Sequence, residues 1–367
     1  MSHTQQLTAE PVFHNEGAVF HQGRFHNTRV AFETDAANLW QVTKAYLGAK
    51  RAAPRPDVAV PLCEIDEAEL ARDEARLYRL GHSTVLIRLD GKWLLTDPVF
   101  SERASPVQWA GPKRFHDSPL TPEQLPFIDA VILSHDHYDH LDKAAIKALD
   151  AKVGQFIAPL GVGQRLRAWG VAAEKITELD WWQGISLGSI RLTATPSQHF
   201  SGRGLLDKNH TLWASWVLAG KQARVFFSGD SGYFEGFREI GERFGPFDIT
   251  LMETGAYNEL WADIHMHPQQ SLQAHLDVAG MALLPIHNGT FDLALHDWYE
   301  PLERIEALAR RQGVVLLTPR FGEPVSLRSP KPTSLWWREL MHEQDLAIAA
   351  LTEESGLCSL RLFPDKT

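Results

Sequence analysis

The sequence predicts a layered α/β fold in which β-sheets of mixed strand direction pack with helices. Short apolar segments of strand length alternate with helical segments between residues 83 and 317, and this alternation is typical of layered α/β domains. Asp90-Gly91 separates two apolar runs, which is the strongest two-residue signal for a hairpin and therefore for antiparallel pairing. The composition agrees, because 44% hydrophobic and 22% charged residues are usual for a globular protein.

The first 75 residues carry weaker signals, and we expect residues 1–75 to be an N-terminal arm and linker that packs on the rest of the chain. A helix is predicted over residues 38–49, where apolar side chains recur at helical spacing. Three prolines between residues 51 and 61 indicate an extended linker. The acidic segment 64–74 is predicted to be a short surface helix.

The central part of the chain, residues 76–330, is predicted to be one domain. Its strands are expected where short apolar runs occur, over residues 83–89, 92–96, 129–134, 155–157, 190–194, 211–218, 224–227, 248–252, 282–286 and 314–317. Its helices are expected where the apolar residues follow a helical period, over residues 143–149, 234–244, 268–277 and 302–311. Trp181 and Trp182 are expected to pack in its core.

The pattern changes after residue 330, and residues 331–367 are expected to form a C-terminal helical extension. Lys331-Pro332 interrupts the chain there, because proline cannot continue a regular element. Trp336 and Trp337 lie in the helix that follows. The two indoles could cover a site, contact another subunit or anchor the tail.

Charge and apolar patterning exclude several classes of protein. With 36 Lys and Arg against 46 Asp and Glu, the formal net charge is −10, and a net acidic chain is a poor partner for nucleic acid. No apolar run reaches the ~18 residues of a membrane-spanning helix, and the first residues lack the apolar core of a secretory signal. Two cysteines far apart in sequence suit a reducing compartment. We therefore expect a cytoplasmic protein, and peripheral contact with a membrane and a homodimer both stay open.

Four side chains of metal-ligand type follow one predicted strand within six residues: His135, His137, Asp139 and His140. A loop that leaves a strand end can turn several side chains toward one point, and imidazole and carboxylate groups bind Zn²⁺ and related ions. Asp136 lies between the histidines and could face solvent. The alternative is a histidine-rich surface loop without a specific ion.

Three further predicted strands end in the same types of side chain. His199, Asp230 and His287 each follow a strand of the central domain. A single residue of this kind is more often a hydrogen-bonded polar group of the core. Four strand ends with His or Asp, however, are the pattern expected when one edge of a sheet sandwich binds metal ions. The sequence therefore favours a metal site.

The H-x-H-x-D-H motif, followed in order by His199, Asp230 and His287, resembles the metallo-β-lactamase superfamily. Further segments resemble one branch of it, N-acyl-phosphatidylethanolamine phospholipase D and its bacterial relatives. These segments begin at Gly81, Thr96, Gly111, Leu179, Phe244, Gly255 and His287. The motif alone indicates only the superfamily, whereas the additional segments, spread from Leu77 to Ser326, indicate the branch.

The resemblance implies the metallo-β-lactamase fold, an αββα four-layer sandwich, for a catalytic domain of residues 76–330. It also implies a site for two Zn²⁺ ions, with Mn²⁺ or Fe²⁺ as alternatives. The first ion would be bound by His135, His137 and His199, the second by Asp139, His140 and His287, and both by a bridging Asp230.

Such a site would leave coordination positions open for water and substrate, as catalytic zinc sites do. A water between the two ions would be acidified and would act as a hydroxide nucleophile. We therefore take Asp139, Asp230 and His265 as the candidate catalytic residues. His265 could hydrogen-bond a phosphoryl oxygen or protonate the leaving alkoxide; its alternative is an exposed histidine at the start of a helix.

Contacts with the substrate are predicted for Lys113, Arg114, Tyr138 and His296. Lys113 and Arg114 could attract an anionic head group, and their alternative is a pair of solvated surface charges. Asp97 could support a ligating imidazole or form a turn. His82 could be structural or functional.

The function expected from these residues is that of a zinc-dependent hydrolase, a phosphodiesterase of the phospholipase D type with a phospholipid-like substrate. A lactonase or an amide or ester hydrolase is the alternative on the same binuclear site, because a fold does not determine a substrate. A metal-binding relative without activity is disfavoured by the complete ligand set.

Overall fold

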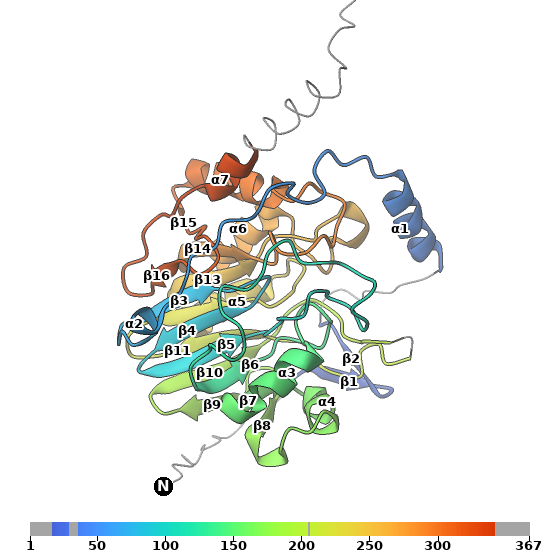
Figure 1. The fold of residues 1–367 in the computed structure, drawn as a ribbon. Helices are drawn as coiled ribbons and strands as arrows, with labels where there is room; N and C mark the ends of the chain where they lie inside the picture. The colour runs from blue at the N-terminus through green and yellow to red at the C-terminus, as the bar shows by residue number, and fades with distance from the viewer. Residues whose placement is uncertain (1–16, 29–35, 205, 342–367) are drawn as a thin grey trace, which may run out of the picture.

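Two seven-stranded β-sheets lie face to face at the centre of the chain, and helices cover the outer faces (Figure 1). This is the αββα four-layer sandwich expected from the sequence. The computed structural model describes residues 17–28, 36–204 and 206–341. Within these ranges, none of the helices has the length and apolar composition of a membrane-spanning segment. Parts of the predicted N-terminal arm and most of the predicted C-terminal extension lie outside the described ranges.

The first sheet begins with antiparallel strands and continues with parallel ones. β16, β3, β4 and β5 pair antiparallel, whereas β5, β6, β7 and β8 pair parallel. Asp90 and Gly91 form the predicted turn between β4 and β5, with φ angles of 47° and 75° that suit a two-residue hairpin. Across the sheet the strands are β16 (Pro324–Ser326), β3 (Arg76–Arg79), β4 (Val85–Leu89), β5 (Lys92–Thr96), β6 (Ile128–Ile132), β7 (Val153–Pro159) and β8 (Ile176–Leu179).

The second sheet has the same mixed character. Its strands from β9 to β12 pair antiparallel, and those from β12 to β15 pair parallel. Across the sheet they are β15 (Val315–Leu316), β14 (Gly280–Ile286), β13 (Phe247–Glu253), β12 (Arg224–Phe227), β11 (Ser215–Ala219), β10 (Ile190–Thr195) and β9 (Gly184–Leu187). A separate hairpin precedes both sheets and consists of β1 (Val19–His21) and β2 (Arg24–His26).

The helices pack their apolar faces on the outer sides of the sandwich. α3 and α4 cover the first sheet, while α5, α6 and α7 cover the second. α3 begins where Asp142 accepts a hydrogen bond from the N–H of Ala144 at 2.9 Å, which caps the helix. The helices are α1 (Ala36–Gly48), α2 (Glu67–Leu70), α3 (Lys143–Leu149), α4 (Val162–Ala168), α5 (Gly236–Phe244), α6 (Pro268–Asp277) and α7 (Glu300–Gln312), with short 3₁₀ turns η1 (Asp150–Lys152), η2 (Ala173–Lys175) and η3 (Glu259–Trp261).

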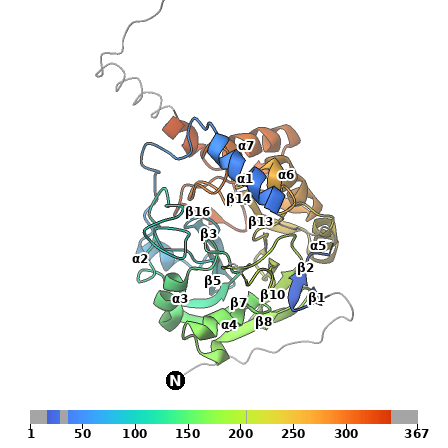
Figure 2. The same ribbon diagram turned by 90° about the vertical axis from the view of Figure 1, so that its right-hand side faces the viewer.

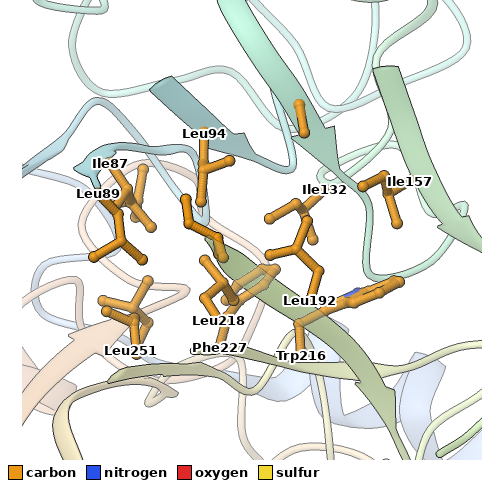
Figure 3. Close-up of a cluster of buried hydrophobic side chains, with 14 of the residues drawn as sticks. Ile87, Leu89, Leu94, Ile132, Ile157, Leu192, Trp216, Leu218, Phe227 and Leu251 are labelled. Atoms are coloured by element: carbon orange, nitrogen blue, oxygen red, sulfur yellow. The ribbon is translucent and has the colours of Figure 1, made fainter. Parts of the chain in front are cut away.

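Strand pleating divides the apolar side chains between two kinds of core. In β4, Val85, Ile87 and Leu89 point between the sheets, whereas Leu86 points to the outer face under the helices. Each of these side chains contributes about 1.5–3 kcal/mol to stability through burial. Figure 3 shows the inner core, in which one sheet contributes Ile87, Leu89, Leu94, Ile132 and Ile157 and the other contributes Leu192, Trp216, Leu218, Phe227 and Leu251.

Most predicted elements form within a few residues of their expected bounds, but the strand expected over residues 211–218 is shorter. It begins as β11 only at Ser215. The preceding residues pair with loops instead, because the N–H of Leu212 donates to Leu160 O at 2.8 Å and that of Ala214 donates to Ser134 O at 2.9 Å. The acidic helix expected over residues 64–74 forms only one turn, α2. The sequence did not predict α4 or several short edge strands.

The C-terminal extension is packed on the sandwich where it is described. Trp336 and Trp337 are 1% and 0% exposed. Trp336 packs against Trp298 and Phe321 at ring-centroid distances of 6.2 and 5.9 Å, and Nε1 of Trp337 donates to Glu303 of α7 at 2.5 Å. Of the three roles considered for these indoles, the structure therefore shows anchoring of the tail. Trp181 is buried and Trp182 is partly buried in the core, as predicted.

Replacement of Trp336 by Ala is expected to lower the free energy of unfolding by about 3–5 kcal/mol, since it leaves a large cavity between α7 and the linker. Urea denaturation measures the change. Trp109→Ala is the matched control, because that indole is 83% exposed and its removal should change the free energy by less than about 0.5 kcal/mol. Equal effects of the two substitutions would show that the extension does not stabilise the domain.

Candidate metal centre

The candidate site lies where strands of both sheets end. β6 leads into the histidine loop, and β10, β12 and β14 lead into His199, Asp230 and His287. Gly229 has a φ of 56°, and a Cβ placed on it would lie 2.6 Å from Cβ of Ser134. Only glycine therefore allows the turn before Asp230 to approach the histidine loop of the other sheet.

Charged groups hold the histidine loop from behind. Asp136 is fully buried, so the interpretation that it could face solvent is wrong. Its carboxylate accepts hydrogen bonds from Nε of Arg165 at 2.7 Å and from the N–H of Gly202 at 2.8 Å. Arg203 also donates to the main-chain O of Asp136 at 2.7 Å. The error arose because nothing in the sequence places Arg165 opposite the loop.

The first cluster of candidate ligands consists of His135, His137 and His199. Nδ1 of His137 lies 2.9 Å from Nε2 of His135 and 3.3 Å from Nε2 of His199. A tetrahedral ion with bonds of about 2.0–2.1 Å separates its ligand nitrogens by roughly 3.3 Å. These two distances are close to that spacing, and one ligand atom from each of the three residues lies within 4.8 Å of the others, so the cluster could hold a single ion.

The second cluster is centred on Asp139. Its Oδ2 lies 3.5 Å from Nε2 of His140 and 3.3 Å from Nε2 of His287. His82 joins this cluster, with Nε2 at 3.4 Å from the same oxygen and its ring 3.9 Å from that of His287. The structure thus brings together all three predicted ligands of the second ion and adds His82 beside them.

Asp230 lies between the two clusters. Oδ1 is 3.1 Å from Nε2 of His140, and Oδ2 is 3.0 Å from Nε2 of His287. The same Oδ2 is 3.8 Å from His135 and 3.7 Å from His199. One carboxylate is therefore within reach of ligands from both groups, as a bridging role requires.

The donor set suits a cation. Nε2 of His140 and Oδ1 of Asp230 are buried and face each other at 3.1 Å, but their geometry is not that of a hydrogen bond, and neither has another hydrogen-bond partner within the described part of the chain. Buried polar atoms without partners cost free energy, and an ion bound between these two would satisfy both. The residues present therefore fit a bound metal ion.

The charges of the site agree with this fit. Burial disfavours the ionised form of Asp230, but the positive charges of His140 and His287 hold the pKa of Asp230 well below its usual value. Burial also lowers the pKa of His287, but Asp230 and Asp139 outweigh it and raise that pKa to about 10. The site therefore contains buried carboxylates that stay ionised and stabilise positive charge near them, as a cation-binding site does.

Two residues support the ligands from outside the clusters. Oδ2 of Asp97 accepts from Nδ1 of His140 at 2.6 Å and from Oγ of Ser134 at 2.5 Å, as the supporting role considered for Asp97 requires. Asn27 forms two hydrogen bonds with the main chain of His199. Nδ2 of Asn27 donates to His199 O at 2.8 Å, and Oδ1 of Asn27 accepts the N–H of His199 at 3.1 Å. Sequence reasoning missed Asn27, and a lone asparagine in a polar segment offered no signal for it.

A cavity of ≈ 430 Å³ opens onto both clusters. Its polar side is lined by His137, Asp139, Asp230, His265 and His287. Its remaining side is largely apolar and is lined by Val42, Tyr46, Phe200, Ala256, Leu260, Trp261, Ile264 and Leu293. Tyr46 of α1 stacks on Trp261 with ring centroids 6.2 Å apart, so α1, which faces the viewer in Figure 2, forms part of the cavity wall.

His265 lies in this cavity beside a residue that sequence reasoning missed. Its Nδ1 forms a hydrogen bond with Oε1 of Glu253 and lies 4.0 Å from Oδ2 of Asp230. Burial lowers the pKa of His265 to about 4. Glu253 directly follows a predicted strand, as the other ligand-type residues do, and that position was the signal that could have identified it.

The four residues predicted to contact substrate are outside the lining of this cavity. Lys113 forms an exposed ion pair with Glu102 at 2.6 Å, and Arg114 is buried and donates to Phe100 O at 3.0 Å. Tyr138 lines a second cavity of ≈ 540 Å³, where Arg203 lies over its ring. Nε2 of His296 accepts the N–H of Ala256 at 3.1 Å and so supports the cavity from behind.

The chain has clear counterparts among known proteins. Residues 92–288 match the family model of the β-lactamase superfamily domain. An uncharacterized protein of Mycobacterium tuberculosis is 44% identical over 305 residues, which cover 82% of this chain and 80% of the relative. The N-acyl-phosphatidylethanolamine-hydrolyzing phospholipase D 1 of Caenorhabditis elegans is 37% identical over 243 residues, 62% of this chain and 68% of its own. The solved structure of Igni18, a metallo hydrolase of Ignicoccus hospitalis, has 21% identity and a TM-score of 0.52, over 68% of this chain and 97% of that one.

Asp97→Asn should weaken metal binding by about 10–100-fold. The neutral amide orients the imidazole of His140 less well than the carboxylate does, and the imidazole becomes less basic. Titration of the protein against a competing chelator measures the affinity. The control is Asp73→Asn, whose carboxylate is 82% exposed and pairs with Arg88 at the surface. Unchanged affinity in the Asp97 variant would remove this residue from the centre.

Proposed function

The chain belongs to the β-lactamase superfamily, and from this premise we propose that it is a metal-dependent phosphodiesterase of the phospholipase D type. The proposed substrate is a phosphodiester that carries an apolar chain. The observation that carries the proposal is the cavity of ≈ 430 Å³, because it joins the candidate metal ligands to a largely apolar wall. The relative from Caenorhabditis elegans that is named for hydrolysing N-acyl-phosphatidylethanolamine supports the same reaction class.

The apolar wall suits an acyl or alkyl chain. Phe200, Leu260 and Ile264 lie along it, and Trp261 and Tyr46 add aromatic surface. Each methylene group that leaves water for such a surface contributes about 0.8 kcal/mol. A substrate that is polar throughout would gain nothing from these contacts, so the wall favours a lipid-like phosphodiester.

We propose that the centre binds two metal ions, zinc by preference and Mn²⁺ or Fe²⁺ as alternatives, because imidazole and carboxylate ligands suit all three. When bound, such ions acidify water and stabilise the charge that develops on phosphoryl oxygens. The proposed ligands are His135, His137 and His199 for one ion, Asp139, His140 and His287 for the other, and Asp230 for both.

Two residues are proposed to act directly on the reacting groups. Asp139 lines the cavity, so its carboxylate can accept a hydrogen bond from the attacking water and orient it. His265 lines the cavity as well, and its imidazole can donate a proton to the leaving oxygen. Asp230 is proposed to act by keeping the two ligand clusters together.

A substrate panel tests the proposed function. The metal-loaded protein should hydrolyse bis-p-nitrophenyl phosphate and a long-chain phosphodiester faster than a chromogenic lactone, an ester or a β-lactam, and the long-chain diester should have the lower KM. A chelator should abolish the activity, and added zinc should restore it. Faster turnover of the lactone or the ester than of either diester would overturn the proposal in favour of the alternative hydrolase.

A further inference from the structure

Glu253 is a buried carboxyl group at the centre of the site, and the proposed reaction leaves it without a role. It is the last residue of β13, which lies between β12 and β14, the strands that lead to Asp230 and His287. Its side chain is 0% exposed. Because a carboxyl group is rarely buried unless hydrogen bonds hold it, the partners of Glu253 indicate what it does.

Both carboxyl oxygens of Glu253 have partners. Oε2 accepts the N–H of Ser231 at 2.7 Å, and Oε1 forms a hydrogen bond with Nδ1 of His265. The main chain is held on both sides, since the N–H of Glu253 donates to Oγ of Ser228 at 2.9 Å and its O accepts from Oγ of Ser271 at 2.6 Å. The carboxyl group therefore has a defined orientation, and it holds the imidazole of His265 by one nitrogen.

The neighbouring rings restrict His265 further. Its ring stacks on that of His287 at a centroid distance of 5.3 Å and meets that of His199 edge-on at 5.1 Å. The side chain of His265 is 15% exposed and lines the cavity. Because Nδ1 is bonded to Glu253, Nε2 is the ring nitrogen left to contact a ligand in the cavity.

We propose that Glu253 is a positioning residue that holds His265 with Nε2 toward the cavity, as the proton donor to the leaving group. The inference rests on the proposed phosphodiesterase function and adds a residue to it. Carboxylate–imidazole pairs fix the tautomer and the orientation of the ring in hydrolases and metal sites of unrelated folds. Glu253 and His265 have the bonding that such a pair requires.

The proposed proton transfer starts from a pair that holds two protons. Before the reaction Oε1 of Glu253 and Nδ1 of His265 share one proton, and Nε2 carries another. The attacking water oxygen bonds to phosphorus, and the proton that this water loses passes by way of the Asp139 carboxylate to solvent, while the bond from phosphorus to the leaving oxygen breaks. The leaving oxygen keeps the bonding electron pair, takes the proton from Nε2 and departs as an alcohol. The pair then carries one negative charge more, until solvent water returns the proton to Nε2.

Two other roles for Glu253 predict different results. If it only satisfies the N–H of Ser231, its replacement should not depend on His265. If it binds a metal ion, its replacement should lower the metal content, and the candidate ligand atoms of Glu253, His265 and His287 do lie within 4.8 Å of one another. Dependence on His265 and an unchanged metal content therefore distinguish positioning from these two roles.

Kinetics of Glu253→Gln, His265→Ala and the double variant provide the first test, with bis-p-nitrophenyl phosphate and diphenyl phosphate as substrates. Diphenyl phosphate releases phenolate, which is more basic than the p-nitrophenolate released by the other substrate. Proton donation to the leaving group therefore accelerates the hydrolysis of diphenyl phosphate more. We expect full metal content in all variants and a loss of kcat on diphenyl phosphate of about 10–100-fold for Glu253→Gln and about 10²–10⁴-fold for His265→Ala. The losses on bis-p-nitrophenyl phosphate should be much smaller.

The double variant should be no slower than His265→Ala alone, since Glu253 acts through that ring. Additive losses, equal losses on the two substrates, or a lower metal content in Glu253→Gln would overturn the proposal. Glu259→Gln is the matched control, because that carboxylate is 90% exposed and lies 3.6 Å from His267; it should behave as the wild type.

Proton–nitrogen NMR spectra of the imidazoles test the pair without relying on activity. His265→Asn identifies the signals of His265. In the wild type a proton signal should report the hydrogen bond that Nδ1 shares with Glu253, and in Glu253→Gln the amide should donate to Nδ1, so that this signal is lost. A wild type without a proton in the hydrogen bond between Nδ1 and Glu253 would overturn the positioning role, even if Glu253→Gln does not fold. If no phosphodiester is hydrolysed, the proposed function fails, and the spectra still decide how Glu253 holds His265.

Discussion

Two buried clusters of histidines share one carboxylate, Asp230, and the rest of the site depends on that contact. Its two oxygens lie 3.1 Å from Nε2 of His140 and 3.0 Å from Nε2 of His287, and two histidines of the first cluster, His135 and His199, are within 3.8 Å. Burying ionised carboxylates and imidazoles costs free energy unless opposite charges and hydrogen bonds offset it. A shared anion between the clusters provides that offset, and a bound cation would complete it. The proposed chemistry follows from the same feature, since the cavity opens onto this carboxylate.

The sandwich is what brings Asp230 to the histidines. The alternating side chains of the two sheets form an inner core, and that core sets the distance between strand ends that are far apart in sequence. The chain outside the sheets stabilises the arrangement further. Asn27, near the start of the described chain, bonds both main-chain groups of His199, and Trp336, near its end, packs under α7. The predicted arm and extension are therefore in contact with the domain in their described parts.

Much of the fold could be predicted because the strands are short apolar runs between turn signals, and β5, β12 and α6 have the predicted bounds. The candidate ligands could be predicted because each follows such a strand. Long-range partners could not: Asp136 meets Arg165, and Asn27 meets His199, only after the sheets have stacked. The surroundings of Lys113 and Arg114 could not be predicted for the same reason. Their charge does not reveal that Lys113 pairs with Glu102 or that Arg114 is buried.

Whether Asp230 joins two metal-binding clusters can be decided from the metal content of the protein, measured by mass spectrometry after purification without chelator and again after zinc is added. If Asp230 joins two clusters into one centre, the wild type should hold close to two equivalents per chain. Asp230→Ala should remain folded and hold one equivalent or less, because both ions lose a shared ligand. A wild type that holds one equivalent and takes up no more on addition of zinc would contradict the account.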